Sequence, residues 1–197
     1  MRLALVRHAE TAEDARGRCY GSLDVGLSVT GHEQCARLAD VFRREPVAAV
    51  WASPTVRARE TAEAIAAPHR LDVGILEELR ELDFGELEGR AYDEIAASDP
   101  ELYEQWMTAP TTVRFPGGES YADLQARVDA GIAELLEGHD GGLVVVVTHG
   151  GVVRAVLRSV LELHPERIFR LSIDPASTTC LEWIDGEPVV RGVNRRV

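Results

Sequence analysis

Short apolar runs rich in β-branched residues alternate along this 197-residue chain with amphipathic helical patterns, and this alternation constrains the fold most strongly. The runs are about five residues long and several are uninterrupted, which is typical of strands covered on both faces. Strands that alternate with helices favour an α/β fold around a largely parallel sheet. The expected strands cover residues 3–6, 47–51, 73–76, 143–147, 180–184 and 188–193.

Cap signals indicate where the helices between these strands begin. A capping-box pattern that starts at Thr30 predicts one helix, and Ser53 is the expected N-cap of another that extends to residue 67. Ser120 precedes a third helix with a clear apolar stripe, and a fourth follows Gly150. We therefore predict a three-layer α/β/α sandwich around a mostly parallel sheet, in a single domain over residues 1–197.

The region from about 84 to 121 departs from this pattern. It holds six of the eleven aromatic residues of the chain but no clear strand, and it ends in the flexible turn Pro116-Gly-Gly118. A helical insertion folded over one end of the sheet explains both features. Its aromatic residues either pack the insertion alone or also contact substrate as part of a lid, and the sequence leaves both interpretations open.

Charge narrows the classes of function. All 21 cationic side chains are arginine, so chemistry that needs a Schiff-base lysine or a Walker-A lysine is excluded. A net charge of −12 argues against nucleic acid as a partner. A small anionic substrate remains compatible with this charge, because a pocket needs only local positive charge.

Cysteine spacing and hydropathy indicate the setting of the protein. Cys19, Cys35 and Cys180 form no C-x-x-C pair, so we expect neither a disulfide framework nor a metal site, and reduced thiols fit the cytoplasm. The apolar run near the start is too short for a signal peptide. The longest apolar run, 143–147, is far shorter than the roughly 20 residues that cross a bilayer, so no membrane association is expected. The sequence leaves open whether the protein forms a homodimer.

Residues suited to phosphate chemistry follow three of the expected strands. Arg7 and His8 come directly after the first, Arg57 shortly after the second, and His149 with Gly150 after the fourth. Ligands in open α/β sheets bind beyond the carboxyl ends of strands, so we expect these residues to converge. Arginine forks and helix N-termini bind phosphate oxygens, and a neutral imidazole can attack phosphorus. The sequence therefore predicts a phosphate pocket.

The chain also carries four motifs in order: Leu5-Val-Arg-His-Ala-Glu-Thr11, Ser53-Pro-Thr-Val-Arg57, Leu79-Arg-Glu81 with Phe84-Gly85 and Glu88-Gly89, and Val147-Thr-His-Gly-Gly151. Together they resemble the signature set of the histidine phosphatase superfamily, the phosphoglycerate mutase-like proteins. Each motif alone is short, but four at compatible spacing over almost the whole chain are specific.

The resemblance implies a role for each matching residue. His8 would be the phosphorylated nucleophile, and Arg7, Arg57 and His149 would hold the phosphate. Glu81 would give a proton to the leaving oxygen and then take one from water, and a nearby dianionic phosphate favours the protonated form of a carboxyl group. Without the family pattern Glu81 is one acid among several. The further candidates for substrate contact are Tyr20, Gly21 and Gly150.

Two positions depart from the family pattern. Ala9 stands where many relatives have glycine, a small-for-small change that leaves the turn workable. Asp14 stands where many relatives place an asparagine near the phosphate. A carboxylate there would repel phosphate unless Arg16 or Arg18 neutralises it or the loop turns it outward.

Three functions are compatible with these residues. The short chain, with the segments Tyr20-Gly21-Ser-Leu-Asp-Val-Gly-Leu27 and Pro116-Gly-Gly-Glu-Ser120, resembles most the broad-specificity phosphatases and the α-ribazole phosphatases of cobalamin assembly. This resemblance implies a phosphomonoesterase that acts on a small phosphorylated metabolite without a cofactor. In the alternative, a phosphoglycerate mutase, a substrate hydroxyl takes the phosphoryl group, but those relatives carry a tryptophan-asparagine pair where this chain has Thr11-Ala-Glu-Asp14. A phospho-ligand binding module would need neither His8 nor Glu81.

Overall fold

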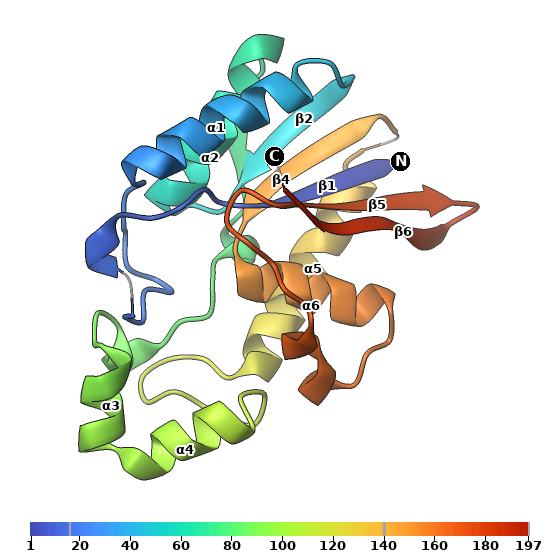
Figure 1. Ribbon diagram of the computed structural model, residues 1–197. Coiled ribbons are helices and arrows are strands. Elements are labelled where there is room, and N and C mark those ends of the chain that lie inside the picture. Colours follow the sequence, from blue (N-terminus) through green and yellow to red (C-terminus); the bar gives the residue numbers. More distant parts are fainter. Residues whose placement is uncertain (16, 140, 197) are drawn as a thin grey trace.

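A computed structural model describes residues 1–15, 17–139 and 141–196, with the side chain of Asp14 also outside the description (Figure 1). Its six named strands are β1 (Arg2–Arg7), β2 (Val47–Ala52), β3 (Val73–Ile75), β4 (Leu143–Thr148), β5 (Thr178–Ile184) and β6 (Glu187–Arg195). They form one sheet in the order β3-β2-β4-β1-β5-β6. The pairs among β1 to β4 are parallel, whereas β5 runs antiparallel to β1 and β6. The mostly parallel sheet is confirmed.

Helices cover both faces of this sheet. They are α1 (Val29–Phe42), α2 (Val56–Ala66), α5 (Tyr121–Glu137) and α6 (Gly150–Val160), whereas α3 (Tyr92–Ser98) and α4 (Pro100–Thr108) lie outside these layers. Side chains of β1 alternate between two cores: Ala4 and Val6 pack with α1 and α2, while Leu3 and Leu5 pack with α5 and α6. The three-layer sandwich is therefore confirmed.

The predicted helical insertion is also present. It contains α3, α4 and a 3-10 turn at Gly85–Leu87, and Figure 1 shows these helices beyond the carboxyl end of β1, away from the layers of the sandwich. Phe84, Trp106 and Phe115 pack against one another with ring centroids 4.9 to 5.4 Å apart. The insertion thus has a small core of its own, shared with Cys19 from the loop after β1.

Two helix starts differ from the cap signals. The first helix begins at Val29, because the side chain of Ser28 caps it by accepting from the Gly31 N–H at 2.9 Å. The second begins at Val56 with Thr55 as its N-cap. Ser53 is not a cap because its hydroxyl is used elsewhere, as described below. The predicted cap at Ser120 is confirmed.

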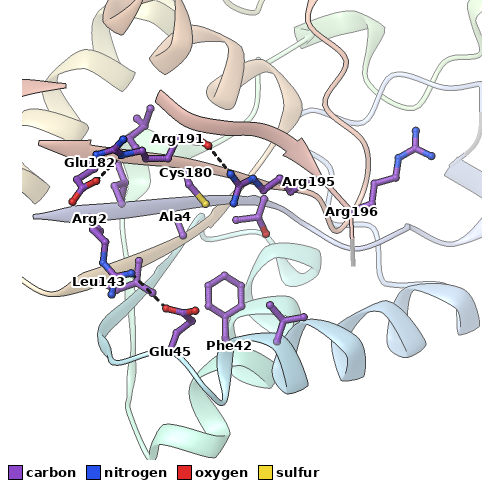
Figure 2. A pocket seen from close by; sticks show the side chains of 14 residues that line it. Arg2, Ala4, Phe42, Glu45, Leu143, Cys180, Glu182, Arg191, Arg195 and Arg196 are labelled. Carbon is purple, nitrogen blue, oxygen red and sulfur yellow. Dashed lines mark hydrogen bonds and ion pairs between the residues drawn. The ribbon is translucent and has the colours of Figure 1, made fainter. Parts of the chain in front are cut away.

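The sheet face beside α1 carries a groove of about 500 Å³ (Figure 2). Small side chains of Ala4 and Cys180 lie at its floor beside Phe42, and β6 contributes arginines to its rim. Arg191 pairs with Glu182 at 2.7 Å across this rim. None of Arg7, His8, Arg57, Glu81 and His149 is among the described residues that line this groove. Among the described residues, no helix is long and apolar enough to cross a membrane.

Candidate functional site

A cleft of about 150 Å³ lies beyond the carboxyl ends of β1 and β4. These strands are parallel neighbours, with Arg7 paired to Thr148, so the two histidines that follow them lie side by side. The rings of His8 and His149 have centroids 5.2 Å apart. The residues that line the cleft are Arg7, His8, Arg18, Tyr20, Arg57, Glu81, Phe84, Tyr92 and His149.

The tautomer of His8 follows from its hydrogen bonds. The Nδ1 atom lies 2.8 Å from the carbonyl oxygen of Ala9. Because a carbonyl oxygen can only accept, Nδ1 carries the hydrogen, and Nε2 of the neutral ring keeps its lone pair. Burial, followed by the charges of Arg57 and Arg7, lowers the pKa of His8 well below its usual range. A neutral ring with a lone pair on Nε2 can act as a nucleophile.

The position of Ala9 is itself fixed by helix α2. The backbone N–H of Ala9 donates to Oγ1 of Thr61 at 3.1 Å, and the same hydroxyl donates to the carbonyl of Arg57 at 2.8 Å. Thr61 is buried, so neither bond competes with solvent. This hydroxyl therefore links the turn that orients His8 to the helix that carries Arg57.

Arg57 is fully buried and is held by backbone carbonyls. Its Nη1 donates to Leu23 at 2.7 Å, and its Nη2 donates to Gly21 at 2.8 Å and to Tyr20 at 3.1 Å. The Nε atoms of Arg57 and of Arg7 are buried, and neither has a hydrogen-bond partner within the described part of the chain. Buried donors normally find acceptors, so these two N–H groups suit the oxygens of an anion.

His149 is bound on both ring nitrogens. Nη2 of Arg57 lies 3.5 Å from Nδ1, and Oγ of Ser53 lies 2.7 Å from Nε2. Since arginine only donates, Nδ1 accepts and Nε2–H donates to the serine. Burial, and next the charge of Arg57, lowers the pKa of His149 well below its usual range. The ring is therefore neutral and fixed, and Ser53, read from the sequence as a helix cap, is what fixes it.

Glu81 presents its carboxylate to the same cleft at the N-terminus of α6. Oε2 accepts from the Gly151 N–H at 3.1 Å, and Oε1 accepts from the N–H of the next residue at 3.0 Å. Just before it, the carbonyl of Leu79 accepts from Oγ1 of Thr148 at 2.8 Å. The segment that carries the acid is thus attached to the end of β4, beside the histidines.

Of the three candidates for substrate contact, only Tyr20 is among the described residues that line the cleft. Tyr20 lines the cleft, and its ring lies 5.3 Å from the guanidinium carbon of Arg57. Gly21 and Gly150 are buried and are not among the described residues that line it. The Gly21 backbone packs so closely on the Leu82 carbonyl that a Cβ atom there would overlap with it, which explains why glycine is needed.

Three cleft residues were not singled out as site residues in the sequence. Phe84 and Tyr92 belong to the aromatic-rich insertion, and Phe84 also belongs to the third motif. The motif and the number of aromatic residues in the insertion were therefore the available signals. Arg18 follows no strand, so its position gave none; its Nη1 donates to the Gly89 carbonyl at 2.8 Å. The question raised by Asp14 and Arg16 lies outside the described side chains.

Comparisons with known proteins agree with this geometry. A family model described as the histidine phosphatase superfamily (branch 1) matches residues 3–196. The chain is 37% identical over 196 residues to the bifunctional protein Rv2228c of Mycobacterium tuberculosis, covering 98% of this chain and 54% of that protein. It is 32% identical over 194 residues to phosphoserine phosphatase 1 of Hydrogenobacter thermophilus, covering 98% of this chain and 92% of that one.

A solved structure gives the same result. The α-ribazole phosphatase of Shigella flexneri superposes with a TM-score of 0.91 at 27% identity, covering 100% of this chain and 98% of that chain. The mycobacterial relatives are longer, and this chain spans about half of their length, 54%. The family match nevertheless extends over nearly every residue, and the chain belongs to branch 1 of the histidine phosphatase superfamily.

Proposed function

We propose that this chain is a phosphomonoesterase that hydrolyses a small phosphate ester through a phosphohistidine intermediate on His8. The observation that carries the proposal is the state of the His8 ring. Its Nδ1–H is bound to a carbonyl and its pKa is lowered by burial and by two arginines, so Nε2 carries a lone pair at neutral pH. That atom is the one that would attack phosphorus.

The first step forms the Nε2–phosphorus bond and breaks the bond from phosphorus to the ester oxygen. The buried Nε–H groups of Arg7 and Arg57 would bind the phosphoryl oxygens and stabilise the charge of the transition state. Glu81 would donate its proton to the departing oxygen, which leaves as an alcohol. In the second step, water gives a proton to Glu81 and attacks phosphorus, which releases inorganic phosphate and restores His8.

The substrate beyond its phosphate would contact the side chains at the mouth of the cleft. Tyr20, Phe84 and Tyr92 offer aromatic surface there, and Arg18 offers one cation. Aromatic surface suits a planar group, which supports α-ribazole phosphate as a candidate. The relatives named for phosphoserine make that smaller, charged ester the main competitor.

The location we propose is cytoplasmic. Cys19, Cys35 and Cys180 are all free thiols in the structure, and free thiols are typical of a reducing compartment.

Phosphate release from a substrate panel tests the activity. The panel contains α-ribazole phosphate, phosphoserine, 3-phosphoglycerate and sugar phosphates, with His8→Ala alongside and circular dichroism to check its fold. We expect one ester to turn over fastest and His8→Ala to release nothing. Transfer of the phosphoryl group within 3-phosphoglycerate, without release of phosphate, would indicate a mutase instead.

Trapping the intermediate tests the mechanism directly. Acid-labile, alkali-stable phosphate should remain on the wild-type protein after brief exposure to labelled substrate and denaturation. His8→Ala should carry none, while Glu81→Gln should still be labelled by p-nitrophenyl phosphate, whose leaving group needs little protonation. Label that persists in His8→Ala would contradict the assigned nucleophile.

A further inference from the structure

Arg127 of α5 uses all five of its N–H groups in hydrogen bonds. Its Nη1 donates to the carbonyls of Glu78 at 2.8 Å and Arg80 at 2.6 Å, and its Nη2 donates to the carbonyl of Glu81 at 2.9 Å. The remaining two N–H groups form a bidentate pair with Glu119, with both distances 2.7 Å. One side chain thus holds the backbone at the proposed acid and at two of the residues before it.

Glu119 lies at one end of the insertion and binds the other end. Its N–H donates to the Asp83 carbonyl at 2.9 Å, and its carboxylate accepts from the Asp83 N–H at 3.1 Å. Asp83 directly precedes the insertion and Glu119 lies near its end, so we call these two residues and Arg127 the neck.

The two backbones at the neck approach each other too closely for side chains. A Cβ atom at Gly118 would overlap with the Asp83 carbonyl, and one at Gly85 would overlap with the carbonyl of Pro116. Gly85 also has φ of +54°, which favours glycine. The two backbone segments can therefore meet at the neck only because residues 85 and 118 are glycines.

The ion pair within the neck is partly shielded from solvent. The side chains of Arg127 and Glu119 are 17% and 22% exposed. Burial acts to raise the pKa of the Glu119 carboxyl, but hydrogen bonds from Arg127 and from the Asp83 N–H outweigh it, and the pKa lies below its usual range. The carboxylate is ionised at neutral pH, and the pair has the planar, two-bond geometry that fixes orientation.

From this arrangement we propose that Arg127 is a positioning residue for the reaction: through the neck it fixes the Glu81 carboxyl beside His8. Arg127 does not line the cleft among the described residues, so it acts through the backbone of Glu81 rather than on substrate. This inference rests on the acid role of Glu81 proposed above. A displaced acid slows the first step only for esters that need a proton on the leaving oxygen. The kcat/KM value reports this step, because the later hydrolysis of the phosphohistidine, in which Glu81 would act as base for every ester, does not enter it.

Arg127→Lys tests the proposal with a pair of esters. Lysine keeps the charge near Glu119 but has three donors and no planar fork, so it cannot hold three carbonyls and a bidentate carboxylate together. We expect kcat/KM for β-glycerophosphate, an alkyl ester, to fall about tenfold or more relative to kcat/KM for p-nitrophenyl phosphate. Thermal unfolding is measured in parallel to show that the variant is folded. A loss of folded protein alone would lower both rates by the same factor and leave their ratio unchanged.

The matched control is Arg114→Lys, which alters an exposed ion pair with Asp123 at the start of the same helix. It should leave the ratio unchanged. Where Arg127→Lys fails to fold, Glu119→Gln replaces it: the amide keeps the shape but loses the charge, and we expect a smaller shift in the same direction. A uniform loss on both esters, or no loss, in the folded variant overturns the positioning role.

Glu81→Gln, run in the same assay, separates the two proposals. If it discriminates between the esters and Arg127→Lys does not, the acid role stands and the positioning role is rejected. If Glu81→Gln lowers kcat/KM equally for both esters, Glu81 is not the acid and both proposals fail at that point, while loss of all turnover in His8→Ala still supports the nucleophile.

Discussion

The Glu81 carboxylate lies so close to Gly151 that a Cβ atom at position 151 would overlap with Oε1. Because Gly151 has no side chain, the carboxylate fits at the N-terminus of α6. We predict that Gly151→Ala displaces the carboxyl group and lowers kcat/KM for alkyl phosphates by about 10²-fold, the lower end of what general acid catalysis contributes. p-Nitrophenyl phosphate should be affected much less. Steady-state kinetics on both esters measure the difference.

Gly26→Ala is the control for that substitution, because a Cβ atom there meets no neighbouring atom within 4 Å. It should leave both rates near those of the wild type. Equal kinetics for Gly151→Ala and Gly26→Ala would show that the contact with Glu81 does not matter for the reaction.

The hydrogen bond from His149 to Ser53 predicts a cost for Ser53→Ala. The substitution leaves a buried ring N–H without its acceptor, which costs about 1 to 3 kcal/mol of unfolding free energy. Loss of ring orientation should also lower kcat/KM. Urea unfolding and kinetics check both effects.

Ser177→Ala is matched to it, because the Ser177 hydroxyl is buried but has no hydrogen-bond partner among the described residues. Its removal should change stability by much less. A similar loss in the two variants would mean that the Ser53 bond adds nothing to stability.

The two buried histidines predict a pH dependence of stability. Burial first, and then the charge of Arg57, lowers the pKa of both His8 and His149. In the unfolded chain a histidine takes up a proton near pH 6.5. The stability due to the neutral rings is therefore complete above about pH 6.5 and is lost as the pH falls from there toward the lowered folded values, by up to about 1.4 kcal/mol per pH unit for each ring.

Urea unfolding between about pH 7.5 and pH 5 measures this slope. The double variant His8→Asn with His149→Asn should have a flatter profile than the wild type, since its unfolded state has two fewer protons to gain. His164→Asn, at an exposed position, should keep the wild-type slope. Parallel profiles for all three proteins would assign the slope to other groups.

Chelation should leave the activity intact. In the proposed mechanism the positive charge that stabilises the transferring phosphoryl group comes from Arg7 and Arg57, and the nucleophile is an imidazole rather than a metal-bound water. Phosphate release after treatment with EDTA should match the untreated rate. Loss of activity that is restored by a divalent ion would contradict this mechanism.

The fold could be predicted from the sequence because its signals are local. Uninterrupted valine and leucine runs gave the strands, and helical spacing gave the layers. The start of α2 could not be predicted, since the sequence cannot show that Ser53 binds a histidine 96 positions later in the chain. Tertiary hydrogen bonds of this kind override the capping preference of a serine.

The site residues also fall into those that local signals predicted and those that depend on tertiary contacts. Arg7, His8 and His149 lie where adjacent parallel strands end, so strand prediction brought them together. Arg18 and Arg127 are held by the carbonyls of distant loops, and no periodicity or short motif marks such contacts. In the sequence, Arg18 was noted only as a cation that could neutralise Asp14, and Arg127 was not noted at all. Their contacts became visible only once the packing of the loops was known.

The carbonyl contacts of Arg57 affect how its mutants should be interpreted. The same guanidinium group that faces the cleft also holds the loop at Tyr20, Gly21 and Leu23. Replacing it would remove a charge and at the same time release the loop that carries Tyr20. The free energy lost in such a variant is thus a sum of two effects, and it overstates what Arg57 contributes to holding phosphate.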